Sequence, residues 1–71
     1  MGGTYYGAIS RVEASYCLIR RNGVADTISA QRENIEEQNW KGLSYGTRVH
    51  FSIAFNFYGP TAIAVAVEGL L

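Results

Sequence analysis

The clearest strand in the sequence is Arg48-Val49-His50-Phe51-Ser52-Ile53-Ala54-Phe55-Asn56-Phe57-Tyr58. Large apolar residues alternate with polar or small ones along this stretch, which predicts a β-strand with one face on the core. We therefore expect Phe51, Ile53 and Phe55 in the core, and Phe57 and Tyr58 at a hairpin tip that is a candidate contact site. Gly59-Pro60 ends the strand, because proline has no N–H to donate to a β-ladder.

Shorter segments on either side carry the same kind of pattern, and glycines separate them. Four further strands are expected: Thr4–Val12, Ser15–Arg21, Val24–Ala30 and Thr61–Glu68. Asn22-Gly23 is typical of a tight turn, since both residue types tolerate a positive φ. The polar segment Ser29–Trp40 has no continuous apolar stripe, so we expect a loop with one helical or 3₁₀ turn. Five short strands fit an OB-type or an SH3-like barrel, and periodicity alone does not choose between them.

Composition limits the functions that are open to the chain. Its 71 residues are 48% hydrophobic and 17% charged with a net charge of zero, which indicates one globular domain that is not strongly basic. Cys17 is the single cysteine, so no internal disulfide can form and a cytoplasmic location is expected. No apolar run approaches the roughly 20 residues that span a bilayer, so no membrane partner is expected.

No motif indicates catalytic chemistry. The sequence contains no recognisable Ser-His-Asp arrangement, paired carboxylate motif or glycine-rich phosphate loop. We therefore expect a protein that is not an enzyme and uses no cofactor. His50 has no cysteine, histidine or carboxylate cluster near it in the sequence, which argues against a metal site.

Four segments share the order and spacing of a known family. Trp40-Lys41-Gly42-Leu43-Ser44-Tyr45-Gly46-Thr47-Arg48-Val49-His50-Phe51 follows the pattern aromatic-Lys-x-Leu-x-x-Gly-x-x-Val-x-Phe. Further on, Gly59-Pro60-Thr61-Ala62-Ile63-Ala64-Val65 follows Gly-Pro-x-Ala-x-x-Val. In the first half, Gly7-Ala8-Ile9 and Tyr16-Cys17-Leu18-Ile19 are similar to Gly-x-Val and Phe-Gly-Phe-Ile. These are motifs of the cold-shock domain family, which the chain resembles along nearly all of its length.

The resemblance implies a single five-stranded antiparallel OB-type barrel over residues 4–70 that binds single-stranded RNA or DNA on the face of its first three strands. It implies base stacking for Tyr16, which keeps a ring, whereas Leu18 and Ile28 replace rings of the family. Trp40 matches a loop aromatic, which either stacks on a base or covers the open end of the barrel. Pro60 matches a proline beside the ligand groove. Phosphate contacts are expected from Arg11, Arg20 and Arg32.

The position of Ile28 depends on the register of its strand. The family's Asp-Val-Phe-Val-His best matches Asp26-Thr27-Ile28-Ser29-Ala30, which would place Thr27 and Ser29 inward, and a shift by one residue reverses this. Neither register restores a stacking ring. The chain therefore resembles a divergent member of the family with a degenerate aromatic surface, and we expect weak binding with little sequence preference.

The alternative function is protein–protein interaction or self-association on the same fold after the loss of base stacking. It is favoured by the zero net charge, the missing rings and an apolar last strand that leads to Leu70-Leu71. A homodimer would bury such a strand.

Overall fold

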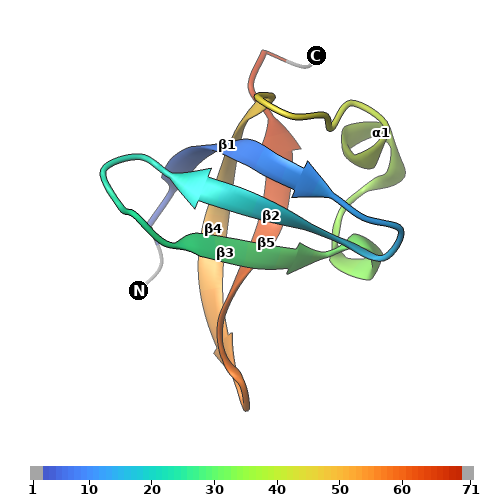
Figure 1. The fold of residues 1–71 in the computed structure, drawn as a ribbon. Helices are drawn as coiled ribbons and strands as arrows, with labels where there is room; N and C mark the ends of the chain where they lie inside the picture. The colour runs from blue at the N-terminus through green and yellow to red at the C-terminus, as the bar shows by residue number, and fades with distance from the viewer. Residues whose placement is uncertain (1–2, 70–71) are drawn as a thin grey trace.

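Hydrogen bonds order the five strands of the protein as β3-β2-β1-β4-β5 in one antiparallel sheet (Figure 1). The computed structural model describes residues 3–69. Leu70, the last residue of the expected domain, and Leu71 lie outside the described residues. The strands are β1 (Tyr5–Val12), β2 (Tyr16–Arg21), β3 (Thr27–Gln31), β4 (Arg48–Asn56) and β5 (Gly59–Val67). A 3₁₀ turn, η1 (Arg32–Asn34), and a short helix, α1 (Glu37–Trp40), connect β3 to β4. The expectation of five antiparallel strands with a helical turn before the fourth is confirmed.

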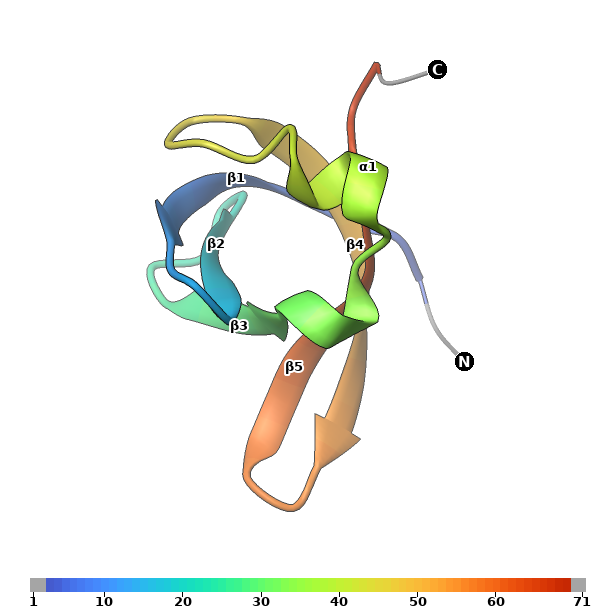
Figure 2. The same cartoon turned by 90° about the vertical axis from the view of Figure 1, so that its right-hand side faces the viewer.

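The sheet curls, so that its two edge strands, β3 and β5, lie against each other (Figure 2). One bond between them joins a side chain to the backbone: the Thr61 hydroxyl donates to the Ser29 carbonyl at 3.1 Å. A β-bulge in β5 adds to the curvature opposite Phe51, where Ala64 adopts a positive φ of 54°. The sheet therefore has one inner face, on the core, and one outer face.

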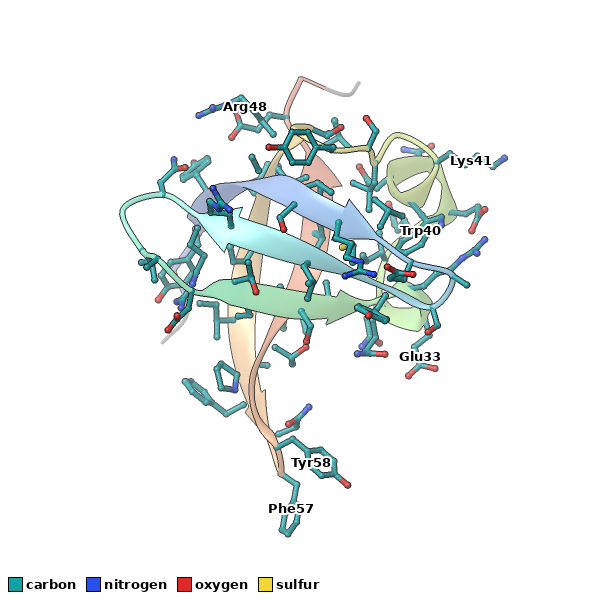
Figure 3. The ribbon with its side chains drawn as sticks, in the orientation of Figure 1. Glu33, Trp40, Lys41, Arg48, Phe57 and Tyr58 are labelled. Carbon is teal, nitrogen blue, oxygen red and sulfur yellow. The ribbon has the colours of Figure 1, made fainter. Side chains whose placement is uncertain are left out.

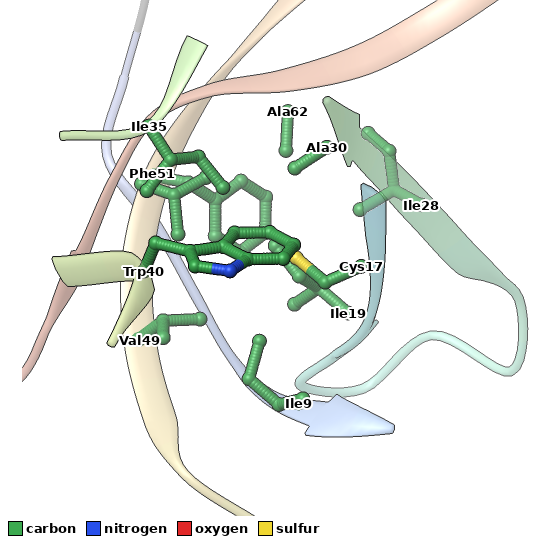
Figure 4. Packing of buried hydrophobic residues seen from close by; sticks show 11 residues of the cluster. Ile9, Cys17, Ile19, Ile28, Ala30, Ile35, Trp40, Val49, Phe51 and Ala62 are labelled. Carbon is green, nitrogen blue, oxygen red and sulfur yellow. The ribbon is translucent and has the colours of Figure 1, made fainter. Parts of the chain in front are cut away.

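The core contains the inward residues of all five strands, as period-two alternation requires. Its largest fully buried side chains are Phe51, Ile9, Ile19, Val49 and Cys17. Ile35 and Trp40, from the segment between β3 and β4, pack on this cluster from one end (Figure 4). The remaining buried hydrophobic members are Ile28, Ala30, Ala62 and Val65.

The inward alternation of β4 continues beyond the point where the core ends. Phe51 is buried and Ile53 packs partly against the core, but Phe55 is 79% exposed, so its predicted core position is wrong. The reason is its neighbour: Phe55 pairs with Pro60 in a part of the hairpin that extends past the other strands (Figure 1). Alternation shows which way a side chain points, and another element must still cover it.

The β4–β5 hairpin therefore projects from the body of the fold, with Phe57 and Tyr58 at its tip (Figure 3). The Tyr58 N–H donates to the Asn56 side-chain oxygen at 2.8 Å, which fixes the turn. Gly59, at a φ of 121°, begins β5 two residues before the predicted start. Pro60 follows it within the strand, at a position near the sheet edge where a missing N–H is tolerated.

β1 and β2 approach each other closely at Gly7. A Cβ atom on Gly7 would lie 2.9 Å from the Ile19 methyl carbon Cγ2 and would also overlap the Arg20 carbonyl oxygen. The bulge of β1 lies further along, between Ile9 and Arg11, and Gly7 allows the neighbouring strand to approach.

Candidate nucleic-acid interface

The outer face of β1, β2 and β3 gathers four of the residues that were expected to contact nucleic acid. Strand register sets Arg20 opposite Ala8, and Leu18 opposite Arg11. Tyr16 follows on the same side of β2, because every second residue of a strand shares a face. Arg11, Tyr16, Leu18 and Arg20 thus share one face. The β3 residues on this face are Thr27, Ser29 and Gln31.

Across β1 from Arg20 lies a further exposed arginine, Arg48, which the sequence reasoning did not select. Ala8 pairs with Arg20 on one side and with Arg48 on the other, so the three residues form a row across β2, β1 and β4. Two steps of roughly 4.8 Å between strands set the arginine Cα atoms about 10 Å apart. Figure 3 shows Arg48 at the upper rim of the sheet. The buried Val49 beside Arg48 was the signal that could have placed it outward.

Charge on this face is concentrated on two of its arginines. Arg11 forms an ion pair with Glu13, whose hydrogen bond and charge raise the pKa of the guanidinium above its usual value. Within residues 3–69 the arginines in ion pairs are Arg11 and Arg32. Arg20 and Arg48 form no ion pair among these residues, so their guanidinium groups can bind phosphate as bidentate donors.

Tyr45 adds an exposed ring beside this row. It is 84% exposed and lines a shallow pocket of about 100 Å³ together with Arg20, Ala8 and Ser10. Two backbone bonds hold its loop on β1: the Gly46 N–H donates to the Ile9 carbonyl, and the Ile9 N–H donates to the Thr47 carbonyl, both at 2.8 Å. Sequence reasoning missed Tyr45, since it occupies an unspecified position of the motif. The signal was a tyrosine before a turn glycine.

Trp40 does not belong to the exposed face. Its side chain is 8% exposed and packs on the core, so the expectation of an exposed stacking ring is wrong and the covering role is the one observed (Figure 4). The physical cause is α1, whose single turn directs the ring inward. Arg32 lies over the ring, with its guanidinium carbon 5.1 Å from the ring centroid. The same guanidinium contacts Glu37 and the Ala14 carbonyl, both at 3.4 Å, so its charge is partly compensated.

Ile28 and Pro60 also lie away from the outer face. Ile28 is buried in the core, so the register that placed Ser29 inward is wrong and the register shifted by one residue is the observed one. The β2–β3 pairing decides this, because Ile28 lies opposite the buried Ile19. Pro60 is exposed on the projecting hairpin, opposite Phe55.

A larger polar pocket of about 540 Å³ lies where the β1–β2 turn meets η1 and α1. It is lined by Ser15, Gln31, Arg32, Glu33 and Glu37, together with Ala14 and Ile35. Two carboxylates face one arginine that already contacts Glu37. The pocket thus has no excess of positive charge for an anionic strand, and the row of Arg20 and Arg48 is the better candidate for phosphate.

Two other kinds of site were searched for along the described residues. Within residues 3–69 no group of three histidine, cysteine or acidic side chains is placed to hold a metal ion. No helix in the described part of the chain has the length and apolarity needed to cross a membrane. Comparison of the chain with protein-family models and with curated proteins gave no match.

Proposed function

We propose that this protein binds single-stranded RNA or DNA without catalysis, as a divergent cold-shock-like OB barrel. The observation that carries the proposal is the shared outer face of Arg20, Arg48 and Tyr45, with Tyr16 and Leu18 further along β2. Arginines bind phosphates, and exposed rings stack on unpaired bases with little sequence preference. The proposed binding face includes Tyr45 and Arg48, which the sequence did not indicate, and leaves out Trp40, Ile28 and Pro60.

The dimensions of this face suit a short strand. Tyr16 and Arg20 are four residue steps apart along β2, which corresponds to about 13 Å at roughly 3.3 Å per residue. A length of about 13 Å accommodates three or four bases at the roughly 3.4 Å stacking distance of nucleic acids. One ring that is 84% exposed, Tyr45, and two arginines outside the ion pairs of residues 3–69 support weak binding that depends on salt.

The test is a titration of fluorescently labelled oligo-U and oligo-dT at two salt concentrations. Tyr45→Ala is expected to weaken binding about 5- to 150-fold, the equivalent of one stacked base. Arg20→Gln is expected to lower the slope of log affinity against log salt by about 0.7, since one phosphate contact is lost. Lys41→Gln, which removes an exposed charge at the end of α1, is the matched control and should change neither quantity.

Two results would refute nucleic-acid binding at this face. One is the absence of binding by the wild-type protein at about 100 μM and low salt. The other is binding that Tyr45→Ala and Arg20→Gln leave at its wild-type strength, because a strand would then be held elsewhere.

A second function, self-association or protein binding, is favoured by the projecting hairpin. Phe55, Phe57 and Tyr58 are 79%, 96% and 92% exposed, and no charged residue lies between His50 and Val67. Rings of this size each bury about 150–250 Å² in a contact, so two such tips together cover roughly 900–1,500 Å². That range reaches the lower limit of stable protein interfaces, about 1,200 Å².

Light scattering over a range of protein concentrations tests this second function. Self-association predicts a mass that rises toward a dimer, and Phe57→Ser should return it to the monomer mass without changing the free energy of unfolding. A monomer at all concentrations up to about 1 mM would exclude the homodimer.

A further inference from the structure

A separate pocket of about 390 Å³ lies at the start of β1 and the end of β2. Its lining residues are Thr4, Tyr5, Tyr6, Arg21, Asn22 and Val24. These residues lie at the opposite end of β1 from α1 (Figure 1). The volume falls within the roughly 300–1,000 Å³ that small-molecule sites occupy. The pocket shares no residue with the Arg20–Ala8–Arg48 row.

Arg21 is the residue that gives this pocket its chemistry. It follows Arg20 in β2, so strand alternation turns it to the opposite face of the sheet. Its Nε atom is buried and has no hydrogen-bond partner among the described residues. Neither ion pair found within residues 3–69 includes it. Because no carboxylate among the described residues pairs with Arg21, its charge is available to an anion in the pocket.

Two tyrosines line this pocket, and strand alternation turns their rings to opposite faces of β1. Tyr5 lies on the face of Arg21, and Tyr6 lies on the face of Arg20. The Tyr5 ring stacks on Phe51 with centroids 6.1 Å apart. The Tyr6 ring lies 6.4 Å from the His50 ring and is about half exposed. The Asn22 N–H donates to the Tyr6 carbonyl at 3.0 Å, which holds the β2–β3 turn against β1. The pocket therefore offers a cationic fork from Arg21 and, on the same face of the sheet, the Tyr5 ring, which is 43% exposed.

We propose that this pocket binds a single 5′-phosphorylated nucleotide. The phosphate lies on the Arg21 guanidinium, which donates two parallel hydrogen bonds to it, and the base lies on the Tyr5 ring, which shares the Arg21 face of the sheet. A simple carboxylate would satisfy Arg21 but leave the aromatic surface uncovered, whereas a nucleotide engages both. The site goes beyond strand binding on the outer face and does not depend on it. The same chemistry serves a free nucleotide or the 5′ end of a strand.

The experiment is a titration of the ¹⁵N-labelled protein with uridine 5′-monophosphate, followed by NMR. The Arg21 Nε–H signal and the amide signals of residues 4–6 and 21–24 should shift, and uridine without phosphate should bind at least 10-fold more weakly. Arg21→Gln should weaken binding of the monophosphate at least 10-fold. Arg21→Lys keeps the positive charge but lacks the paired N–H donors of the guanidinium. It should therefore recover only part of the monophosphate affinity that Arg21→Gln loses.

Arg20→Gln is the matched control, because it removes the neighbouring arginine from the other face of the same strand. It should leave binding of the monophosphate at its wild-type strength while weakening binding of oligo-U. Circular dichroism of each variant checks that the fold is kept. Oligo-U with and without a 5′-phosphate distinguishes a strand end from a free nucleotide as the ligand of this pocket. If the pocket binds the phosphorylated strand more tightly than the monophosphate, its ligand is a strand end. If the two affinities are equal, its ligand is a free nucleotide.

Three results would overturn the inference. They are an absence of shifts at residues 4–6 and 21–24 at about 10 mM monophosphate, equal binding of uridine and its monophosphate, and wild-type affinity in a folded Arg21→Gln protein. The two proposals fail separately: loss of oligo-U binding in Arg20→Gln bears on the outer face, and loss of monophosphate binding in Arg21→Gln bears on this pocket.

Discussion

The Arg32 guanidinium covers the outer side of the Trp40 ring, 5.1 Å from its centroid, while the inner side of the ring packs on the core. The two residues come from η1 and α1, so this contact joins the two turns of the β3–β4 connection. It also leaves Trp40 without a free face for a base.

Replacing Trp40 should therefore affect stability. Trp40→Ala is expected to lower the free energy of unfolding by about 3–5 kcal/mol, the usual effect of truncating a buried aromatic residue. Arg32→Ala should lower it by about 0.5–1 kcal/mol and shift Trp40 fluorescence to longer wavelength, because the ring gains contact with water. Urea denaturation followed by circular dichroism measures both. A Trp40→Ala protein within 1 kcal/mol of the wild type would contradict the covering role.

Asn39 is the buried polar residue beside Trp40, and it ties α1 to β5. Its side-chain oxygen accepts a hydrogen bond from the Val67 N–H at 3.0 Å. Asn39→Ala removes the acceptor and leaves a buried donor unpaired, so we expect a loss of about 1–3 kcal/mol. Hydrogen exchange at the Val67 amide should accelerate in this variant. Exchange at the wild-type rate would show that the bond does not protect that end of β5.

Gly7 tests the close approach of β1 and β2. Gly7→Ala places a methyl group against the Arg20 carbonyl and the Ile19 side chain, so we expect a loss of about 1–3 kcal/mol from overpacking. Gly42→Ala is the control, because its new methyl group would meet Val67 at 3.4 Å, an ordinary contact. Thermal unfolding of both variants compares them. Equal melting temperatures would show that the two strands separate at no cost.

Cys17 makes stability depend on alkaline pH. Burial raises the pKa of its thiol from 9.0 to about 11, since the thiolate is poorly solvated in the core. The unfolded state therefore loses its proton first as pH rises, and the stability that the neutral thiol contributes below pH 9 is lost between pH 9 and 11. The loss is on the order of 2–3 kcal/mol by the linkage relation.

Denaturation of the wild type and Cys17→Ala across this pH range isolates the effect, because the tyrosines titrate in both proteins. The wild type should lose more stability than the variant above pH 9. Parallel pH profiles would place the thiol in contact with water, as would rapid reaction of the folded protein with a thiol reagent at pH 8.

The sequence predicted the strands because alternation is a local property of the chain. Alternation along β4 predicted core positions for Phe51, which is buried, and for Ile53, which packs partly against the core. The same pattern gave no information about coverage at Phe55, since coverage depends on which strands extend beside it. Ile28 depended on a one-residue register, which β3 acquires from its pairing with β2.

The candidate site was harder to predict at Trp40 and Tyr45, which lie outside the strands. Polar neighbours surround Trp40 in the sequence, and only the turn of α1 directs the ring inward. Tyr45 precedes a strand, so no alternation indicates its direction, and its loop is placed by bonds to a strand far away in sequence. Tyr16, Leu18 and Arg20 share a face because they alternate along β2, whereas Arg11 reaches that face through the bulge between Ile9 and Arg11, which alternation does not predict.

The tip of the projecting β4–β5 hairpin can change in sequence without affecting how the protein folds. Its tip is distant from the core cluster, so the residues from Phe55 to Tyr58 are free to change without disturbing the buried side chains. Exposed tips are preferred sites for tolerated insertions. A foreign peptide inserted between Phe57 and Tyr58 would thus be displayed at the end of a two-stranded hairpin, which makes the protein a small scaffold for presenting sequences of choice.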